Sequence, residues 1–212
     1  MEGDPSSAPP ARIPQKACAG FAYVKKTRES KVSCLYNDAI TRLCQDEIFS
    51  AVALISMDEV VFEPSFRPYC EQNLCGKYGA NYSCPPDCGT PEEMEARMRQ
   101  YRNALVFQTK WDIDDWYDNA QIKRAKKAHN EAMLRVIERM KARGYWGLMG
   151  GASCCSLCER CAAPEGGPCP FPDIRFSCLS AYCIYVKKLA DACGMEYACA
   201  DGRLALFGLY AF

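Results

Sequence analysis

The feature that most constrains this chain is a run of cysteines in its second half. Cys155, Cys158 and Cys161 follow one another at two-residue gaps, and Cys169-Pro170 comes after a gap of seven. Three thiolates at this spacing can bind one face of an iron–sulfur cubane, and a fourth from further along the chain can bind the remaining corner. The pattern therefore predicts a segment that folds around a metal cofactor.

The residues between Cys161 and Cys169 favour a loop around such a cofactor. Residues 162–168 contain two glycines and two prolines, which let the backbone pass close to a cluster and present N–H groups to its sulfurs. Zinc is the alternative metal, although zinc sites favour two separated C-x2-C pairs. Cys154, directly before Cys155, leaves open which of the two is the ligand. The predicted 4Fe–4S ligands are Cys155, Cys158, Cys161 and Cys169.

A second group of cysteines lies upstream, with a spacing that matches no common motif. It consists of Cys70, Cys75, Cys84 and Cys88. Nearby glycines and the paired prolines after Cys84 indicate an irregular backbone around a bound object. Metal ligation is the favoured interpretation, with a redox disulfide or free thiols as alternatives. If all four cysteines bind, the cluster is closed and suited to electron transfer, whereas three would leave one iron open to a substrate as a Lewis acid.

The remaining cysteines are expected to be small buried hydrophobes, because most of them fall on predicted apolar faces. They are Cys18, Cys34, Cys44, Cys178, Cys183, Cys193 and Cys199.

The cysteine content also bears on the compartment. The chain has 16 cysteines in 212 residues, and its N-terminus lacks the basic start and apolar run of a secretory signal. No stretch approaches the roughly 20 apolar residues of a membrane span. We therefore expect a cytoplasmic protein, because grouped cysteines in a reducing compartment are metal ligands more often than disulfides.

Charge and histidine content argue against several classes of function. Basic and acidic residues balance at 26 each, so no long-range field favours nucleic acid or an anionic membrane. His129 is the single histidine and is expected to be structural, which makes histidine-based catalysis a poor fit. No catalytic residues are predicted, and a redox partner protein is the expected partner. Whether the protein is an enzyme, and its oligomeric state, stay open.

Composition and periodicity divide the chain into a proline-rich tail, residues 1–16, and a single cysteine-rich metal-binding domain, residues 17–212. Strands are expected at Glu59–Phe62, Asn103–Trp111 and Tyr145–Gly150. Helices are expected at residues 37–45, from the N-cap Thr90 to about Tyr101, at Asp118–Arg143 and at Cys178–Ala192. A C-terminal hairpin is expected to pair Met195–Ala200 with Arg203–Tyr210 through Asp201-Gly202. The fold class that follows is α/β or α+β, a mixed sheet with flanking helices and two cysteine-rich cluster loops.

These motifs together resemble the predicted metal-binding protein family known as domain of unknown function 2284. The resemblance covers about residues 45 to 200 and rests on three segments, Cys70–Gly79, Asn81–Pro86 and Cys155–Pro172. It implies a ferredoxin-type cluster at the four downstream cysteines and metal ligation by Cys70, Cys75 and Cys84. Cys88 is not a usual part of the pattern, and Tyr82 stands where tryptophan is common. The resemblance implies metal binding but no reaction.

Three functions are compatible with these observations. The first is a protein that carries one or two 4Fe–4S clusters and passes electrons to a partner enzyme. The second is an enzyme whose upstream three-cysteine site leaves an iron open to a small substrate. The third is a zinc-stabilised interaction module, in which the metal holds the fold together.

Overall fold

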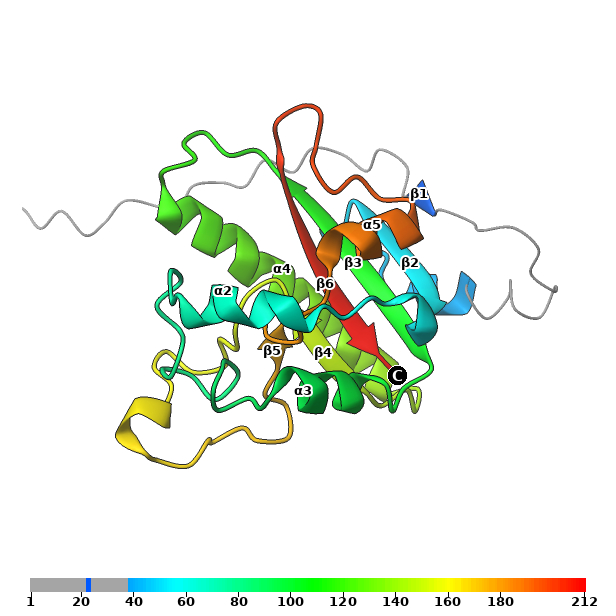
Figure 1. Ribbon diagram of the computed structural model, residues 1–212. Coiled ribbons are helices and arrows are strands. Elements are labelled where there is room, and N and C mark those ends of the chain that lie inside the picture. The colour runs from blue at the N-terminus through cyan, green and yellow to red at the C-terminus, as the bar shows by residue number, and fades with distance from the viewer. Residues whose placement is uncertain (1–21, 24–37) are drawn as a thin grey trace, which may run out of the picture.

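A mixed sheet runs through the middle of the protein in the computed structural model, which describes residues 22–23 and 38–212 (Figure 1). The strand order is β1-β2-β3-β6-β4-β5. The strands are β1 (Ala22–Tyr23), β2 (Ala51–Ser56), β3 (Asn103–Trp111), β4 (Leu148–Gly151), β5 (Ser177–Cys178) and β6 (Leu204–Ala211). The pairs β2–β3, β3–β6 and β6–β4 are antiparallel. At the two edges of the sheet, β1 is parallel to β2 and β5 is parallel to β4.

Two long strands, β3 and β6, form the centre of this sheet. They pair from Ala104 opposite Ala211 to Trp111 opposite Leu204. Both faces of β3 are buried from Ala104 to Thr109, and the strand begins with the apolar run Ala104–Phe107. The strand predicted at Asn103–Trp111 is confirmed residue for residue.

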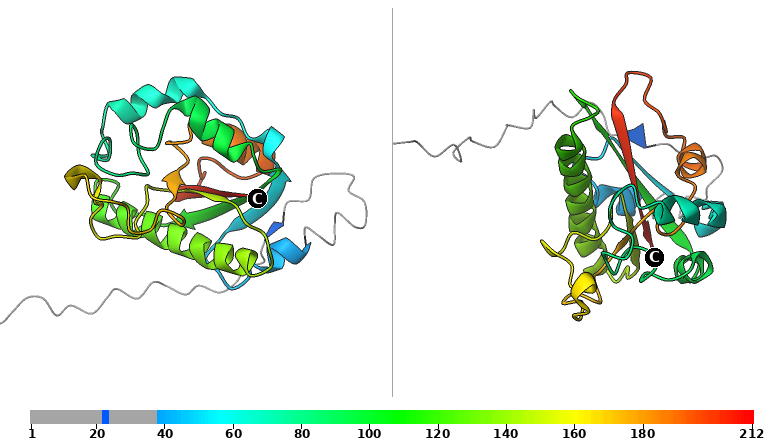
Figure 2. Two further views of the ribbon diagram at one scale, coloured as in Figure 1. Left: turned by 90° about the horizontal axis from the view of Figure 1, so that it is seen from below. Right: turned by 60° about the vertical axis from the view of Figure 1, so that its left-hand side comes forward.

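Helices cover both faces of the sheet. They are α2 (Arg67–Glu71), α3 (Pro91–Met98), α4 (Asn119–Lys141) and α5 (Val186–Cys193), with 3-10 turns at Met57–Glu59, Pro64–Phe66 and Ala163–Glu165. Figure 2 shows α4 on one side of the sheet and α2, α3 and α5 on the other. The protein is therefore a three-layer α+β structure, as the sequence predicted in outline.

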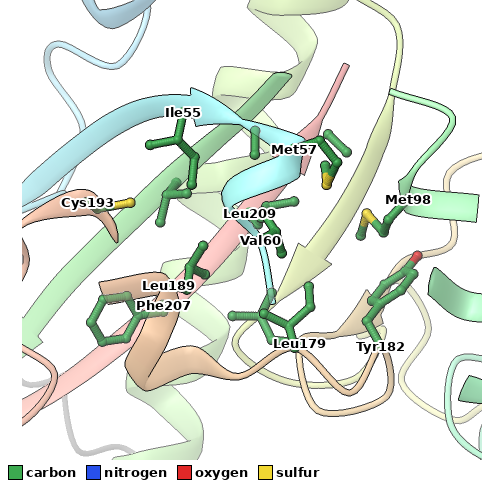
Figure 3. Packing of buried hydrophobic residues seen from close by; sticks show 14 of the residues in the cluster. Ile55, Met57, Val60, Met98, Leu179, Tyr182, Leu189, Cys193, Phe207 and Leu209 are labelled. Carbon is green, nitrogen blue, oxygen red and sulfur yellow. The ribbon is translucent and has the colours of Figure 1, made fainter. Parts of the chain in front are cut away.

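The alternation of side chains along β3 divides the core between the two faces. Leu105 and Phe107 pack with Met133 of α4 and its neighbours, while Ala104 and Val106 belong to the cluster on the opposite face. Figure 3 shows this second cluster, in which side chains from β2, β6, α3 and α5 meet. It also contains Leu179 and Tyr182, which lie in the turn after β5. The core on this side therefore anchors the segment that carries Cys178.

The long helix α4 begins and ends as its sequence predicts. The Asp118 side chain accepts hydrogen bonds from the N–H groups of Ala120 and Gln121, at 2.8 and 3.1 Å, and so caps the N-terminus. Arg139 and Lys141 lie in the last turn, where cations are favourable. The helix predicted after Thr90 is also confirmed, with a capping box between Thr90 and Glu93, but α3 ends at Met98 instead of Tyr101. Residues 38–42 form a short helix.

Three predicted elements differ in the structure: one strand, the first part of one helix, and the C-terminal hairpin. Glu59–Phe62 is not a strand, because Glu59 ends a 3-10 turn and Phe62 makes a single bridge to Ile184. Residues 178–185 are not helical, since Cys178 ends β5 and α5 starts at Val186. Leu179 and Tyr182 are both buried in the intervening turn, so their spacing imitated a helix face.

The C-terminal hairpin is also absent from the described part of the chain. Residues 195–200 form no strand, although the turn at Asp201-Gly202 is present and Gly202 has a φ of 76°. Instead of a hairpin partner, β6 pairs with β3 along its whole length and with β4 at Leu209–Ala211. The final strand is therefore central instead of being half of a hairpin.

The predicted tail at residues 1–16, and Cys18 and Cys34, lie outside the described residues. The single domain at 17–212 stays a prediction. Among the helices that the structure describes, none is both long enough and apolar enough to cross a membrane.

Candidate metal centre

The downstream cysteines lie in an excursion between two neighbouring parallel strands. β4 ends at Gly151, which pairs with Cys178 of β5, and residues 152–176 leave one strand and return into the other. Apart from one 3-10 turn, Ala163–Glu165, this excursion has no regular structure. The four predicted downstream ligands are therefore carried by a loop whose two ends are held by β4 and β5, at one edge of the sheet (Figure 1, yellow to orange).

Asn130 of α4 fixes the start of this loop. Its side-chain oxygen accepts the N–H of Ala152 at 2.9 Å, and its side-chain nitrogen donates to the Ser153 hydroxyl at 2.9 Å. Asn130 is fully buried. A Cβ at Gly151 would lie 2.8 Å from the same Asn130 oxygen, so this close approach requires glycine. The long helix thus sets where the chain leaves the sheet toward Cys154 and Cys155.

All four predicted downstream ligands line one small cavity. The cavity is bounded by Cys155, Cys158, Cys161 and Cys169, together with Asn81, Leu157, Pro170, Phe171 and Arg175. Each of the four cysteines is half-buried. The Cys155 side chain interacts electrostatically with Cys158 and Cys169, and burial raises the pKa of the Cys155 thiol. The spacing pattern thus corresponds to a common space in three dimensions.

The thiols surround this space instead of meeting at one point. In residues 22–23 and 38–212, no three Cys, His, Asp or Glu side chains are gathered closely enough to hold a single metal ion. A tetrahedral zinc site with bonds of about 2.3 Å would need sulfurs about 3.8 Å apart. A cluster is a larger object with a thiolate at each iron. Four cysteines around one cavity supply the number and type of ligands that a cluster needs, and apolar Leu157 and Phe171 lie beside them.

A second loop clamps the downstream loop. The Cys155 N–H donates to the Ser83 hydroxyl at 3.0 Å, and the Asn81 side-chain nitrogen donates to the Cys155 carbonyl at 3.4 Å. The Tyr82 hydroxyl donates to the Gly167 carbonyl at 2.7 Å, and Arg175 lies over the Tyr82 ring. The segment Asn81-Tyr-Ser-Cys84 therefore joins the two cysteine groups. Sequence reasoning treated the groups separately and missed the roles of Ser83, Asn81 and Arg175, which no spacing rule reveals.

The four upstream cysteines do not form one set. Cys70 lies in α2, Cys75 is exposed in the turn that follows, and Cys84 and Cys88 are buried. The Cys84 side chain forms a hydrogen bond with Cys154, not with another upstream cysteine. Cys88 instead accepts from Arg67, with 3.8 Å between the guanidinium nitrogen and the sulfur. Cys84 and Cys88 therefore have different hydrogen-bond partners in the structure.

Cys178, expected to be an inert buried residue, lies among these thiols. It ends β5, and its sulfur accepts the N–H of Ala181 at 3.4 Å. Its side chain interacts electrostatically with Cys154, Cys70 and Cys75. Nothing in its spacing from other cysteines marks it. Its position depends on the parallel pairing of β4 and β5, which is visible only in the fold.

The hydrogen bond between Cys84 and Cys154 makes the two thiols unequal. It lowers the pKa of Cys154, with nearby Lys77 and Lys126 acting in the same direction, and it raises the pKa of Cys84. Burial raises the pKa of Cys70 and Cys178. Of these four thiols, Cys154 is thus the one most readily converted to the thiolate that binds metals.

His129 takes no part in either group. It is fully buried, with 2.8 Å between its Nδ1 and the Thr109 hydroxyl, and its Nε2 has no hydrogen-bond partner among the described residues. Burial lowers the pKa of His129 to about 3. The imidazole is therefore neutral and packs between α4 and β3, as a structural residue would.

A second, larger cavity of about 300 Å³ lies where β4 ends beside β6. It is lined by Lys126, Gly151, Ala152, Leu179, Ser180, Val186, Tyr197, Ala205, Leu206 and Phe207. No cysteine is among these lining residues, but Ala152 and Ser180 lie two residues along the chain from Cys154 and Cys178.

Comparison with known proteins gives one match. No curated protein and no solved structure matches the chain significantly. Residues 53–210, which include both cysteine groups, match the family described as predicted metal-binding protein (DUF2284). Because the match spans more than half of its length, this chain belongs to that family of predicted metal-binding proteins.

Proposed function

We propose that the protein binds a 4Fe–4S cluster through Cys155, Cys158, Cys161 and Cys169 and passes electrons to a partner protein. The observation that carries this proposal is that all four cysteines line one cavity. Their C-x2-C-x2-C spacing and the following Cys-Pro are typical of ferredoxin-type ligation. Membership in a predicted metal-binding family supports it.

The surrounding residues are suited to hold such a cluster. When bound, the cluster would supply reversible one-electron transfer. Asn81, Ser83 and Asn130 hold the loop backbone at its start, while Leu157 and Phe171 reduce the access of water. Arg175 places a positive charge beside the cavity, which offsets the charge of four thiolates. These residues would tune the reduction potential of the bound cluster without taking part in a chemical step.

A loop with half-buried cysteines and exposed apolar side chains also suits delivery of electrons to another protein. Phe171 and Ile174 are 41% and 47% exposed beside the downstream cysteines. Exposed apolar side chains rimmed by polar ones are common at protein interfaces. A cytoplasmic redox partner that docks on this loop is the partner that we propose.

Spectroscopy of anaerobically purified protein tests the proposal. The expected result is a broad visible absorption that bleaches on reduction with dithionite, and an electron paramagnetic resonance signal of a reduced cluster. Reduced protein should then reduce an added one-electron acceptor. Protein that contains zinc, shows no such absorption and unfolds on chelation would replace this function with the zinc-stabilised interaction module.

A second candidate function is supported by the cavity of about 300 Å³ whose lining includes Ala152 and Ser180, two residues from Cys154 and Cys178. An upstream cluster with one open iron could bind a small substrate there, and Lys126, Ser180 and Tyr197 supply polar groups in the lining. Small thiols added to the purified protein would then change the cluster spectrum. An unchanged spectrum would favour a closed cluster and electron transfer.

A further inference from the structure

Cysteines from four separate segments lie near one another on the upstream side of the downstream loop. Cys70 and Cys75 come from α2 and the turn after it, and Cys84 comes from the loop that clamps the downstream loop. Cys154 follows the end of β4, and Cys178 ends β5. We name these five residues the central cysteine group.

Contacts between these segments tie the group together. Cys84 and Cys154 are joined by a side-chain hydrogen bond. The Cys70 sulfur lies 4.0 Å from the Ser180 carbonyl oxygen, two residues after Cys178.

Strand pairing brings Cys178 and Cys154 close to one another. Gly151 pairs with Cys178, and the Leu179 N–H donates to the Gly151 carbonyl at 3.0 Å. Cys154 is only three residues beyond Gly151. The side chain of Cys178 accordingly interacts electrostatically with Cys154, Cys70 and Cys75.

Cys88 has a different environment. Arg67, which is 9% exposed, donates one guanidinium N–H to the Cys88 sulfur and another to the Ala181 carbonyl at 3.0 Å. The Arg67 side chain also interacts electrostatically with Cys183. Cys70 lies within electrostatic range of Cys88, but the sulfur of Cys88 is engaged by a buried cation. This arrangement suits a structural contact between α2 and the core.

We propose that a second iron–sulfur cluster is held by Cys70, Cys75, Cys84 and Cys154, with Cys178 beside it as a fifth thiol and Cys88 outside it. This inference rests on the proposed function, since it assigns a second centre of the same kind. Four thiolates match the number and type of ligands that a 4Fe–4S cluster takes. Lys77 and Lys126 supply positive charge near Cys154.

The assignment gives the adjacent cysteines Cys154 and Cys155 different tasks. Cys155 lines the downstream cavity, whereas Cys154 is bonded to Cys84 on the upstream side. The two centres would then be joined through a single peptide bond. Such a connection suits electron transfer between two clusters, and it explains why two cysteines stand side by side in the sequence.

The test compares Cys154→Ser with Cys88→Ser, because each replaces one candidate fourth ligand. Iron and acid-labile sulfide are measured on anaerobically purified protein, together with the electron paramagnetic resonance spectrum of the reduced state. The wild type should contain about eight irons and a spectrum broadened by two interacting clusters. Cys154→Ser should contain about four irons and a simple spectrum of one cluster. Cys88→Ser should keep the wild-type iron content and spectrum.

Other outcomes separate this inference from the proposed function. Loss of iron in Cys88→Ser with full iron in Cys154→Ser would overturn the ligand assignment. About four irons in the wild type, unchanged in Cys154→Ser and lost in Cys158→Ser, would overturn the second centre and leave the downstream cluster standing. Wild type without iron or sulfide would overturn both. The retained one-cluster spectrum of Cys154→Ser also shows that this variant is folded.

Discussion

The two cysteine groups are built in opposite ways. The proposed downstream ligands follow one another within 15 residues of a single loop, whereas the central cysteine group draws on positions from 70 to 178. The downstream loop has one 3-10 turn and half-buried thiols, while the central group is fixed by α2, β4 and β5. A site whose residues follow one another at a regular spacing can be predicted from the sequence, whereas a site assembled by strand pairing cannot.

This difference also bears on stability. The downstream loop has few regular hydrogen bonds of its own and depends on the clamp of Asn81, Tyr82 and Ser83. The central group is attached to the sheet, whose core is built of buried apolar side chains. Removal of metal should therefore loosen the downstream loop more than the sheet.

The largest expected effect comes from Cys158→Ser, which breaks the downstream side of the comparison. We expect loss of the downstream cluster, and of about half of the iron and sulfide if both centres are present. The central cluster should stay, because Cys158 takes no part in it. Cys199→Ser, a half-buried cysteine near the turn at Gly202, is the control and should keep all of its iron. Equal losses in both variants would show that general destabilisation, not ligation, was measured.

Asn130→Leu tests the attachment of the downstream loop to α4. The variant leaves the Ala152 N–H and the Ser153 hydroxyl without their partner, which should lower the free energy of unfolding by about 1–3 kcal/mol. Anaerobic urea unfolding measures this, with exposed Asn119→Leu on the same helix as the control. Because the loop also carries Cys154, both clusters should become easier to extract with a chelator. Unchanged extraction rates would mean that α4 does not position the loop.

His129 separates acid effects on the scaffold from acid effects on the clusters. Its pKa is about 3 in the folded protein, below the ordinary value of about 6.5, so falling pH adds a proton to the unfolded chain first. Stability should be unaffected by this group above about pH 6.5 and should decrease by about 1.4 kcal/mol per pH unit from there toward pH 3. Urea unfolding of wild type and His129→Gln between pH 4 and pH 7 checks this. The variant should lack that part of the slope, and parallel curves would show that His129 is not buried in its neutral form.

The smallest expected effect sharpens the role of the clamp. Tyr82→Phe removes only the hydrogen bond to the Gly167 carbonyl and should cost about 0.5–1.5 kcal/mol, with the ring contact to Arg175 retained. Chelator extraction should become faster for the downstream cluster alone. Tyr117→Phe, at a tyrosine that is 92% exposed, is the control. Faster extraction of the central cluster as well would show that the clamp supports both groups.

The parts of the fold that the sequence predicts well are those with strong local signals. The caps at Asp118 and Thr90 fixed the starts of two helices, and the apolar run at Asn103–Trp111 predicted the central strand. The turn after Cys178 was misread because buried Leu179 and Tyr182 lie at helical spacing without a helix. The final strand was misplaced because its partners, β3 and β4, come from distant parts of the chain.

The same reasoning applies to the candidate site. Cys155, Cys158, Cys161 and Cys169 could be grouped from spacing because a loop brings near neighbours together. Cys88 was grouped with Cys84 by proximity in the sequence, although Arg67 holds it elsewhere. Cys178 and Ser83 gave no signal, since their positions follow from β5 and from a contact across 72 residues.

The most direct test of the metal centre is the content of iron, zinc and acid-labile sulfide per chain in anaerobically purified protein. We expect about eight irons, about eight sulfides and negligible zinc, which corresponds to one cluster at each cysteine group. Zinc without sulfide would contradict this and would make the cysteines ligands of a structural metal.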